Sequence, residues 1–391
     1  MANMQRNKQI VCISTQYWDE PWFRKQQFMS RFAVRGWSIA YIEPSFSILK
    51  GPPKNKRDIA NNHPVNVKIE RYSKNITLIK PPMALPFWYY PFWGEINYFY
   101  FSFVISATLK RIGFKNYILW LYWPLYLHGL KNFHYRKLVF DISDDFSGYL
   151  KYNQAQSNFL SNNADTLANR SDMVWTTATK LFTKYRSKIT PEKLHLIPNG
   201  FDDALFDGKK QFPCPTELKN LPRPLIGFVG TIFSYLDFEL IQFLAENNRD
   251  FTFVFVGPCE SNIERKFTRI LQNKNAVWLG KKTKDSIPGF VNQFSVCINP
   301  FKAGSMADSI NPLKVYEYLA LRKKVVSVKM ESLEEERISR YISFAEDFYD
   351  FDKKLKSAVQ DQAVPSGLDE DILSYTWDAL FERAYSLIQN L

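Results

Sequence analysis

The chain has 391 residues, of which 46% are hydrophobic and 16% aromatic, and its formal net charge is +12 at pH 7. This composition excludes a disordered chain, and the length predicts two domains of roughly 100–200 residues each. Its four cysteines lie far apart without a CxxC pair or clustered histidines, so the sequence predicts reduced thiols in the cytoplasm and no structural zinc.

The start of the chain and its charge bear on location and partners. Residues 1–9 are polar and lack the apolar core of a signal peptide, which favours a cytoplasmic protein. A basic protein binds nucleic acid, anionic lipid or phosphorylated small molecules. The sequence contains no RNA-recognition aromatic motif, zinc-finger spacing or glycine-rich KH loop, so nucleic acid is not expected as a partner.

In the first half, short β-branched and aromatic segments alternate with longer helical patterns, which is typical of β-α units and a parallel sheet. A helix is predicted from Phe23 to Arg35, with Gly36 just beyond its end. The predicted strands are Gln9–Thr15, Ser38–Pro44, Ile76–Pro82, Tyr117–Trp123, Lys137–Ser143, Asp172–Ala178 and Leu194–Asn199.

An aromatic stretch interrupts this pattern, with eleven aromatic residues among residues 87–103. The nearest candidate for a membrane span, Ile96 to Leu109, is shorter than the roughly 20 apolar residues required. Two interpretations are open: an interfacial contact with an anionic membrane surface, or a buried helix with an aromatic loop over the core. Basic residues that would suit anionic headgroups lie nearby at Lys50, Lys54, Lys56 and Arg57.

A second series of strands begins after a linker rich in Pro, Asp and Lys between Phe201 and Pro224. The sequence therefore predicts an N-terminal Rossmann-like domain (1–205), a C-terminal one (206–373) and a final amphipathic helix (374–391). Two doubly wound domains would face a cleft at the carboxyl ends of their sheets, where ligands bind in such folds. The strands of the second series are Leu225–Gly230, Phe251–Gly257, Ala276–Gly280, Val296–Phe301 and Lys324–Val328.

The most informative segment follows the strand that ends at Phe301. After a small polar loop, a helix is predicted to begin with Asn311 as its N-cap and Pro312 at its first position. Free N–H groups and the helix dipole there would bind a diphosphate, and Lys314 would add a positive charge. Glu317, three residues on, could accept hydrogen bonds from ribose hydroxyls. The alternative is an ordinary capped helix with a solvated Lys and Glu.

A second candidate site follows the strand Lys137–Ser143. The sequence Ser143-Asp144-Asp145 places two carboxylates at the carboxyl end of that strand. A carboxylate there could remove the proton from an acceptor hydroxyl as the hydroxyl attacks a sugar carbon. The alternative is a loop in which Asp145 caps the next helix.

Weaker candidates complete the set. Gly230 and Thr231 could contact the diphosphate. Phe301 could contact the nucleobase of a nucleotide ligand or belong to the core. Lys281 could lie near that nucleobase or be solvated. Trp18, Asp19 and Glu20 point to the acceptor side, with either acid an alternative base. Asp141 and Asp144 make a poor metal site, so neither a metal nor a cofactor is expected; His128, His134 and His195 are isolated.

These motifs resemble those of the GT-B glycosyltransferases from about residue 9 onward. Asn311-Pro312-Leu313-Lys314 followed by Glu317-Tyr-Leu-Ala resembles the donor helix of bacterial members. Phe23-Arg24 with Gln26-Gln27-Phe28 resembles their first helix, and Leu196-Ile-Pro-Asn-Gly-Phe-Asp202 the strand that leaves the first domain. Gly227-Phe-Val-Gly-Thr231 resembles the first strand of the nucleotide domain, and Tyr375-Thr-Trp377 the start of a final helix that crosses back.

One departure concerns the stereochemistry. Many retaining members of glycosyltransferase family 4 carry two Glu eight residues apart, the second matching Glu317, but Ser309 stands at the first position, beside Asp308. The Ser143-Asp144 segment resembles the catalytic Ser-Asp-Gly of the inverting xanthan glucuronosyltransferase, which has a Lys in the place of Lys314. On this likeness Asp144 is the base and Asp145 the reserve.

The resemblance implies transfer of a sugar, with inversion, from a nucleotide diphosphate sugar, expected to be a UDP-sugar, to a saccharide hydroxyl. The acceptor is expected to be lipid-linked, at the inner face of the plasma membrane, in cell-surface polysaccharide assembly. The alternatives are a retaining enzyme of the same fold, a sugar-nucleotide 2-epimerase, and a non-catalytic glycan-binding partner.

Overall fold

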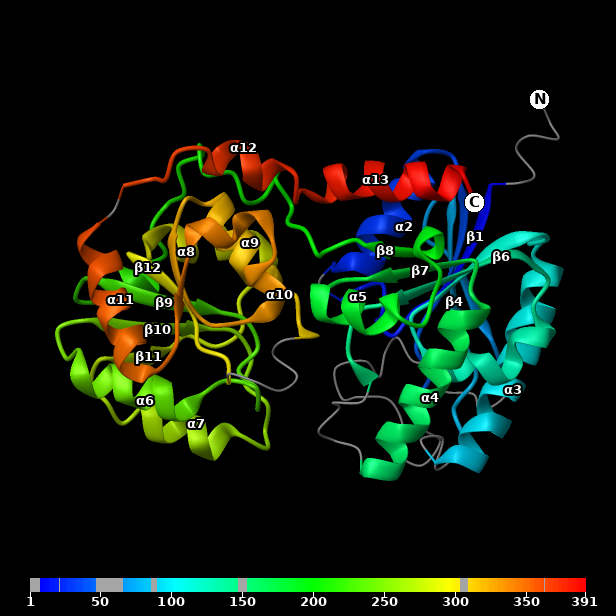
Figure 1. Cartoon of the computed structure of the whole chain (residues 1–391), viewed down its shortest axis with the longest axis horizontal. Helices are drawn as coiled ribbons and strands as arrows, with labels where there is room; N and C mark the ends of the chain where they lie inside the picture. The colour runs from blue at the N-terminus through cyan, green and yellow to red at the C-terminus, as the bar shows by residue number, and fades with distance from the viewer. Residues whose placement is uncertain are drawn as a thin grey trace. The chain divides into compact units, whose positions relative to one another are not determined.

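The computed structural model describes residues 8–20, 22–46, 66–85, 90–146, 153–302, 309–361 and 363–391. The chain divides into two compact units (Figure 1). Unit 1 comprises Met1–Ile197 together with Phe381–Leu391, and unit 2 comprises Pro198–Leu380. The change from one unit to the other thus falls before residue 205, where the sequence placed the domain boundary, because Pro198 to Asp207 is held by residues of unit 2.

Unit 1 is built on an eight-stranded sheet in the order β3-β4-β2-β1-β5-β6-β7-β8. Its described neighbours pair in parallel except β3 and β4, which are antiparallel. The strands are β1 (Gln9–Ile13), β2 (Ser38–Ile42), β3 (Lys68–Arg71), β4 (Ile76–Lys80), β5 (Tyr117–Leu121), β6 (Tyr135–Ile142), β7 (Met173–Thr176) and β8 (Leu194–Leu196).

Helices cover both faces of this sheet, so its central strands are apolar on both sides. On one face, Phe28 and Phe32 of α2 (Arg24–Val34) pack against Trp120 of β5, and Phe32 also meets Phe381 of α13 (Trp377–Gln389). The other face carries a core that α3 shares. The helices there are α3 (Pro91–Arg111), α4 (Gln154–Arg170), α5 (Thr179–Arg186) and the 3₁₀ segments η2 (Pro124–Asn132) and η4 (Pro191–Lys193).

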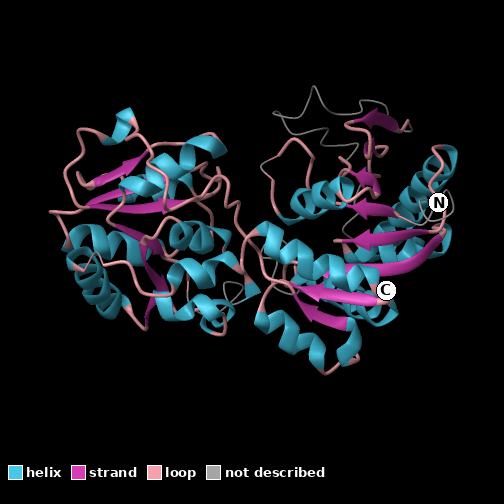
Figure 2. Ribbon diagram, turned by 90° about the horizontal axis from the view of Figure 1, so that it is seen from above, coloured by secondary structure: helices cyan, strands magenta, loops and turns pink. Residues whose placement is uncertain are grey.

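Unit 2 is built on a six-stranded parallel sheet in the order β11-β10-β9-β12-β13-β14, with helices on both sides (Figure 2). The strands are β9 (Leu225–Val229), β10 (Thr252–Val256), β11 (Ala276–Trp278), β12 (Val296–Asn299), β13 (Lys324–Val328) and β14 (Ile342–Ala345). The helices are α6 (Phe238–Asn247), α7 (Glu264–Ile270), α8 (Ile287–Gln293), α9 (Leu313–Ala320), α10 (Glu331–Glu334), α11 (Phe348–Gln360) and α12 (Leu368–Leu373), with 3₁₀ segments η5 (Thr216–Leu218), η6 (Lys284–Ser286) and η8 (Arg337–Tyr341).

The strand order places a switch point in each sheet. From β9 the chain moves outward to β10 and β11, and it then returns to add β12, β13 and β14 on the other side. The same reversal occurs in unit 1 between β1 and β5. In doubly wound sheets, ligands bind beyond the carboxyl ends of the two strands at this point. The strand order therefore points to the loops after β9 and β12, and after β1 and β5, as places for a ligand.

Each predicted strand is present, but the sequence missed β3 and β14. Lys68-Ile-Glu-Arg in β3 is a short, charged edge strand, and β14 follows η8 without a local turn signal. The helix at the aromatic stretch is longer than expected, since α3 begins at Pro91, while Trp88 and Tyr89 lie outside the described residues. Within the described ranges, no helix combines the length and apolarity that crossing a membrane requires.

Helix α13 begins in unit 2 and belongs to unit 1 from Phe381 onward. The side chains of Trp377, Leu380, Ala384 and Ile388 recur every three or four residues and are buried, so the helix is amphipathic as predicted. Leu387 is only half-buried. Phe381, four residues after Trp377, places its ring against Phe32 of α2.

Candidate functional site

The loop after β9 brings the backbone close to two neighbouring segments. Gly230, at the end of β9, has a φ of +144°, and a Cβ there would lie 3.1 Å from Cε of Lys314. A Cβ on Gly257, at the end of β10, would lie 2.0 Å from the carbonyl oxygen of Gly230. Side chains are therefore excluded at both positions, and Thr231, which follows, is exposed. The close approach of Lys314 and of the Gly230 carbonyl explains the two glycines. The diphosphate contact expected of Gly230 and Thr231 stays a prediction.

Lys314 lies in a cage of aromatic rings rather than in solvent. Its ammonium is 4.3 Å from the ring centre of Phe228 and 4.4 Å from that of Phe301, with Phe233 at 5.9 Å. Burial lowers the pKa of Lys314 to about 7, and the neighbouring Glu317 acts in the opposite direction. In the described part of the chain, this ammonium makes no ion pair or hydrogen bond. A half-buried cation held by rings alone is suited to an anionic ligand.

Glu317 lies one turn further along α9 and is also half-buried. Burial raises the pKa of its carboxyl to about 7, the nearby Lys284 and Lys314 oppose this shift, and Asp202 adds to it. Lys284 in turn lies 3.7 Å from the carboxylate of Asp202. The rings around Lys314 and the partial burial of both side chains disagree with the interpretation of Lys314 and Glu317 as solvated surface charges.

Asn311 does not cap the donor helix, and this part of the sequence prediction is wrong. Helix α9 begins at Leu313 with Pro312 as its N-cap residue, so Pro312 is not the first helical residue. The side chain of Asn311 accepts from the backbone N–H of Asn199 at 3.1 Å and donates to Tyr316 Oη at 2.8 Å. Asn199 Nδ2 returns a hydrogen bond to the Asn311 carbonyl at 3.0 Å. These tertiary partners take the groups that a cap would use.

This hydrogen-bonded pair explains why three of the motifs belong together. Asn199 comes from the segment Leu196 to Asp202 and Asn311 from the donor segment. The ring of Tyr375 packs against that of Tyr316, with ring centres 5.0 Å apart. Backbone hydrogen bonds join Phe201 to Tyr375 and Trp377. Each motif holds the others, and together they fix where α9 begins.

Replacing Asn311 by alanine is therefore expected to destabilise unit 2 by about 2 kcal/mol, because it leaves buried partners without hydrogen bonds. The measurement is the thermal or urea unfolding midpoint, with Asn247→Ala on an exposed helix position as the matched control. An Asn311→Ala midpoint equal to that of Asn247→Ala would show that the pair contributes nothing.

The remaining donor-side residues are spread along the same sheet edge. Phe301 is buried and forms one wall of the lysine cage, so it is both a core residue and part of the site. Lys281 is exposed beyond β11, two strands from β9, while its neighbour Lys282 pairs with Glu217 at 2.8 Å. Ser309 is buried, and Asp308 lies outside the described residues.

In unit 1, a buried ion pair closes the end of β6. The guanidinium Nε of Arg24 lies 2.9 Å from both carboxylate oxygens of Asp141, and Arg24 Nη1 donates to the carbonyl of Ile197 at 2.8 Å. Asp141 is fully buried, and Arg24 also lies over the ring of Phe28. The first carboxylate of this loop therefore has a structural role, and it fixes the end of the strand from which Asp144 extends.

Asp144 and Asp145 differ in their surroundings. Asp144 is half-buried and accepts a hydrogen bond from Ser143 Oγ at 3.2 Å. It is also the leading charge that opposes the lowered pKa of Lys25, a buried lysine of α2. Asp145 instead forms an ion pair with Lys184 of α5 at 2.8 Å. The next described α-helix, α4, has Asn153 as its N-cap, whereas Asp145 directly precedes Phe146, which has 3₁₀ conformation, and residues 147–152 lie outside the described residues. The interpretation of Asp145 as a cap therefore stays a prediction.

The loop after β1 holds the acceptor-side candidates. Asp19 is exposed, and Glu20 accepts from the backbone N–H of Tyr17 at 3.3 Å. Trp18 is buried, and its backbone N–H donates to Glu43 Oε1 at 2.9 Å. Trp18 therefore anchors the loop and does not expose its ring to a ligand.

The sequence prediction missed Glu43. This residue is 3% exposed at the carboxyl end of β2, and its Oε2 has no partner among the described residues. Burial raises the pKa of its carboxyl, a shift that the N–H of Trp18 and the nearby Lys80 oppose. The available signal was an acid near the carboxyl end of the predicted strand Ser38–Pro44, which ends at Ile42 in the structure. The described residues contain no group of three or more acidic, His or Cys side chains placed to hold a metal.

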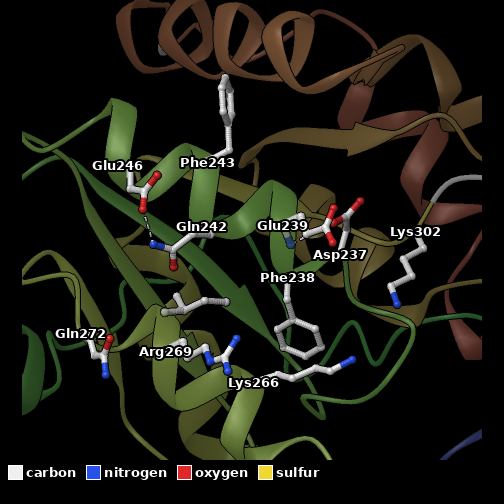
Figure 3. A pocket seen from close by; sticks show the side chains of 11 residues that line it. Asp237, Phe238, Glu239, Gln242, Phe243, Glu246, Lys266, Arg269, Gln272 and Lys302 are labelled. Carbon is white, nitrogen blue, oxygen red and sulfur yellow. Dashed lines mark hydrogen bonds between the residues drawn. The ribbon is translucent and has the colours of Figure 1, made fainter.

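A groove of about 880 Å³ on unit 2 lies apart from these residues (Figure 3). It runs between α6 and α7, with Phe238 and the long side chains of Lys266 and Arg269 lining it. Among the residues that line the groove, Lys302 is nearest in sequence to the rings around Lys314, because it directly follows Phe301. We assign the chemistry to the cage rather than to the larger groove, because the groove-lining charges are mostly exposed.

Comparison with known proteins gives one partial sequence match. No protein-family model matches the chain. Over 165 residues it is 31% identical to a Bacillus subtilis protein named as a teichuronic acid biosynthesis glycosyltransferase, TuaH. This match spans 42% of the length of each chain.

Solved structures match almost the whole chain. Sucrose-phosphate synthase from Thermosynechococcus elongatus superposes with a TM-score of 0.71 at 13% identity, over 98% of this chain and 99% of the other. HepE of Anabaena, solved in complex with UDP and glucose, gives 0.65 at 12% identity, over 98% and 100%. The chain has the GT-B glycosyltransferase fold. In this fold the unit 2 sheet, with β9 and β12 at its switch point, corresponds to the C-terminal Rossmann-like domain that the sequence predicted.

Proposed function

We propose that this GT-B chain transfers a sugar from a nucleotide diphosphate sugar, a UDP-sugar, to a hydroxyl of a saccharide acceptor. The observation that carries this proposal is the caged ammonium of Lys314 at the β9–β12 switch point, where its side chain lies against Gly230. The ammonium would bind one side of the diphosphate, and the exposed Thr231 would contact the other. HepE, whose structure holds UDP, shares the fold.

In the proposed reaction, unit 2 holds the donor and unit 1 supplies the base. The acceptor oxygen bonds to the anomeric carbon as the bond from that carbon to the diphosphate oxygen breaks. Asp144 accepts the acceptor proton, and Lys314 stabilises the charge that develops on the departing UDP. Glu317 accepts hydrogen bonds from the ribose. This is a single displacement, so the anomeric configuration inverts, and the proposal needs neither a metal nor a cofactor.

Ser309 favours inversion over retention. Retaining family 4 enzymes carry a Glu eight residues before the residue that matches Glu317, and a buried serine stands there. The acceptor, in our proposal, is a saccharide carried by a lipid at the inner face of the plasma membrane. The name of the Bacillus subtilis relative, which refers to teichuronic acid biosynthesis, supports a role in cell-surface polysaccharide assembly.

Calorimetry with UDP, GDP, ADP and UDP-sugars tests the donor assignment. UDP is expected to bind, and a ligand at 100 times its dissociation constant should add about 2.7 kcal/mol of stability in a thermal shift. The anomeric configuration of the product, read by NMR, then tests the mechanism. Retention of configuration would exclude Asp144 as the base of a single displacement, and absence of binding by any nucleotide would exclude the donor site.

The affinity for UDP-glucose should depend on pH through Lys314. Because burial lowers its pKa to about 7, the ammonium is lost as the pH rises through 7, whereas an ordinary Lys stays charged. Affinity should therefore fall by up to about tenfold per pH unit above pH 7. The affinity of the Lys314→Met variant should not decrease in this way. Because this variant keeps Glu317, any pH dependence that remains measures the contribution of the Glu317 carboxyl. A parent affinity that is constant from pH 6.5 to about 8.5 would contradict the lowered pKa.

A further inference from the structure

Helix α3 of unit 1 exposes a continuous row of large apolar side chains. Phe92, Ile96, Phe99 and Phe103 recur every three or four residues, so they share one side of the helix. Phe92 is 67% exposed and Phe103 62%. Tyr90 and Trp93, each 44% exposed, flank the start of the row. We call these six residues the aromatic face. They are half of the twelve exposed large hydrophobic residues found in the described ranges, which sets this helix apart from the rest of the surface.

The aromatic face is not needed for packing. The opposite side of α3 carries Tyr98, Phe101, Ile105 and Leu109, and these side chains are buried in the core of unit 1. A helix at the edge of a domain normally turns polar residues to solvent. Here both sides are apolar, so the exposed side fits a partner outside the domain.

Basic groups adjoin the aromatic face. Lys110 lies eighteen residues, or five helical turns, after Phe92 and therefore on the same side, and Arg111 follows it; both are exposed. From the neighbouring segment η2, the ammonium of Lys131 lies 5.2 Å from the ring centre of Phe99. Glu95 is the one acidic residue of α3. Exposed rings beside ammonium groups match the boundary between acyl chains and anionic headgroups.

We propose that the aromatic face is a docking surface for an anionic lipid bilayer, with α3 lying in the plane of the interface. Aromatic rings prefer this depth, and Lys110, Arg111 and Lys131 would contact lipid phosphates. The inference rests on the proposed function only for its purpose, which is to bring unit 1 to a lipid-carried acceptor. A second copy of the chain fits less well, since a symmetric pair would bring these basic groups close to their equivalents in a chain of net charge +12.

The test uses the full chain and vesicles of phosphatidylcholine, alone or with about one third phosphatidylglycerol. The parent should sediment with the anionic vesicles and be released by high salt, because salt screens surface charge. Replacing Phe92, Phe99 and Phe103 together by serine should reduce the partition coefficient at least tenfold. The matched control replaces Val34, Tyr349 and Leu373, which are 86%, 77% and 57% exposed elsewhere, and should bind like the parent.

Two further measurements separate the possible failures. Replacing Lys110 and Arg111 by serine should weaken binding to the anionic vesicles about fivefold for each charge removed. UDP binding and the unfolding midpoint should be unchanged in every variant, so a loss of vesicle binding alone reports on the aromatic face. Parent protein that binds neither vesicle overturns the inference while leaving the donor site intact. So does a dimer that the triple Phe variant dissociates, because the occupant would then be a second copy.

Discussion

Replacing Asp144 by asparagine is expected to lower the rate of transfer by 10²–10⁴-fold, about 3–5 kcal/mol of barrier. The amide keeps the shape of the side chain and can still accept from Ser143 Oγ, but it does not take up a proton. Unit 2 is untouched, so UDP should bind with the affinity of the parent. The measurement is the initial rate at saturating donor together with UDP calorimetry, and a rate loss without an affinity loss is the expected result.

The controls for this prediction come from the neighbouring carboxylates. Asp145→Asn removes the ion pair with the partly exposed Lys184, so it should cost at most about 1 kcal/mol of stability and little rate. Asp19→Asn and Glu20→Gln test the loop after β1, and Glu43→Gln tests the buried acid at the end of β2. A near-normal rate for Asp144→Asn alongside an inactive Asp19, Glu20 or Glu43 variant would make the residue of the inactive variant the base and leave the donor site unchanged.

Replacing Lys314 by methionine should lower kcat/KM by about 10²–10³-fold, because it removes the cation that stabilises the departing diphosphate. Protein stability should be unchanged or higher. Methionine keeps the length and apolar contacts of the lysine stem, and burial already disfavours the charged form of this lysine in the free protein. The loss of the interactions with Phe228 and Phe301 would offset part of that gain.

The matched control for Lys314 is Lys281→Met, which removes the same charge from an exposed loop beyond β11. The affinity of the Lys281→Met variant for the donor should change little. A clear loss would support the sequence interpretation that Lys281 lies near the nucleobase. A Lys314→Met variant that binds UDP as tightly as the parent would show that the diphosphate does not lie at the cage. Glu317→Ala should separately weaken UDP binding through the ribose, and an unchanged affinity would remove Glu317 from the site.

Much of the fold follows from local sequence patterns. Apolar β-branched segments that alternate with helical spacing predict strands of parallel sheets, and Gly or Pro marks their ends. The order of these segments was enough to predict two doubly wound units, and hence loops at the carboxyl ends of β9 and β12. The motif around Lys314 and Glu317 was likewise visible, because residues three apart on a helix share a side whatever surrounds the helix.

The environment of those residues was decided by contacts between distant parts of the chain. Asn311 looks like an N-cap locally, but Asn199, 112 positions away, takes its side chain, and α9 begins two residues later. Lys314 could have been a solvated charge, yet the rings of Phe228, on β9, and Phe301, just after β12, enclose it. Glu43 is an acid that neighbouring segments bury, whereas the aromatic face of α3 is apolar and stays exposed because no described segment covers it. Residue type and spacing determine which side chains share one side of a strand or helix. The burial of that side depends on what packs against it, and burial in turn shifts pKa values and decides whether an apolar row is exposed. Only the tertiary structure supplies that second surface.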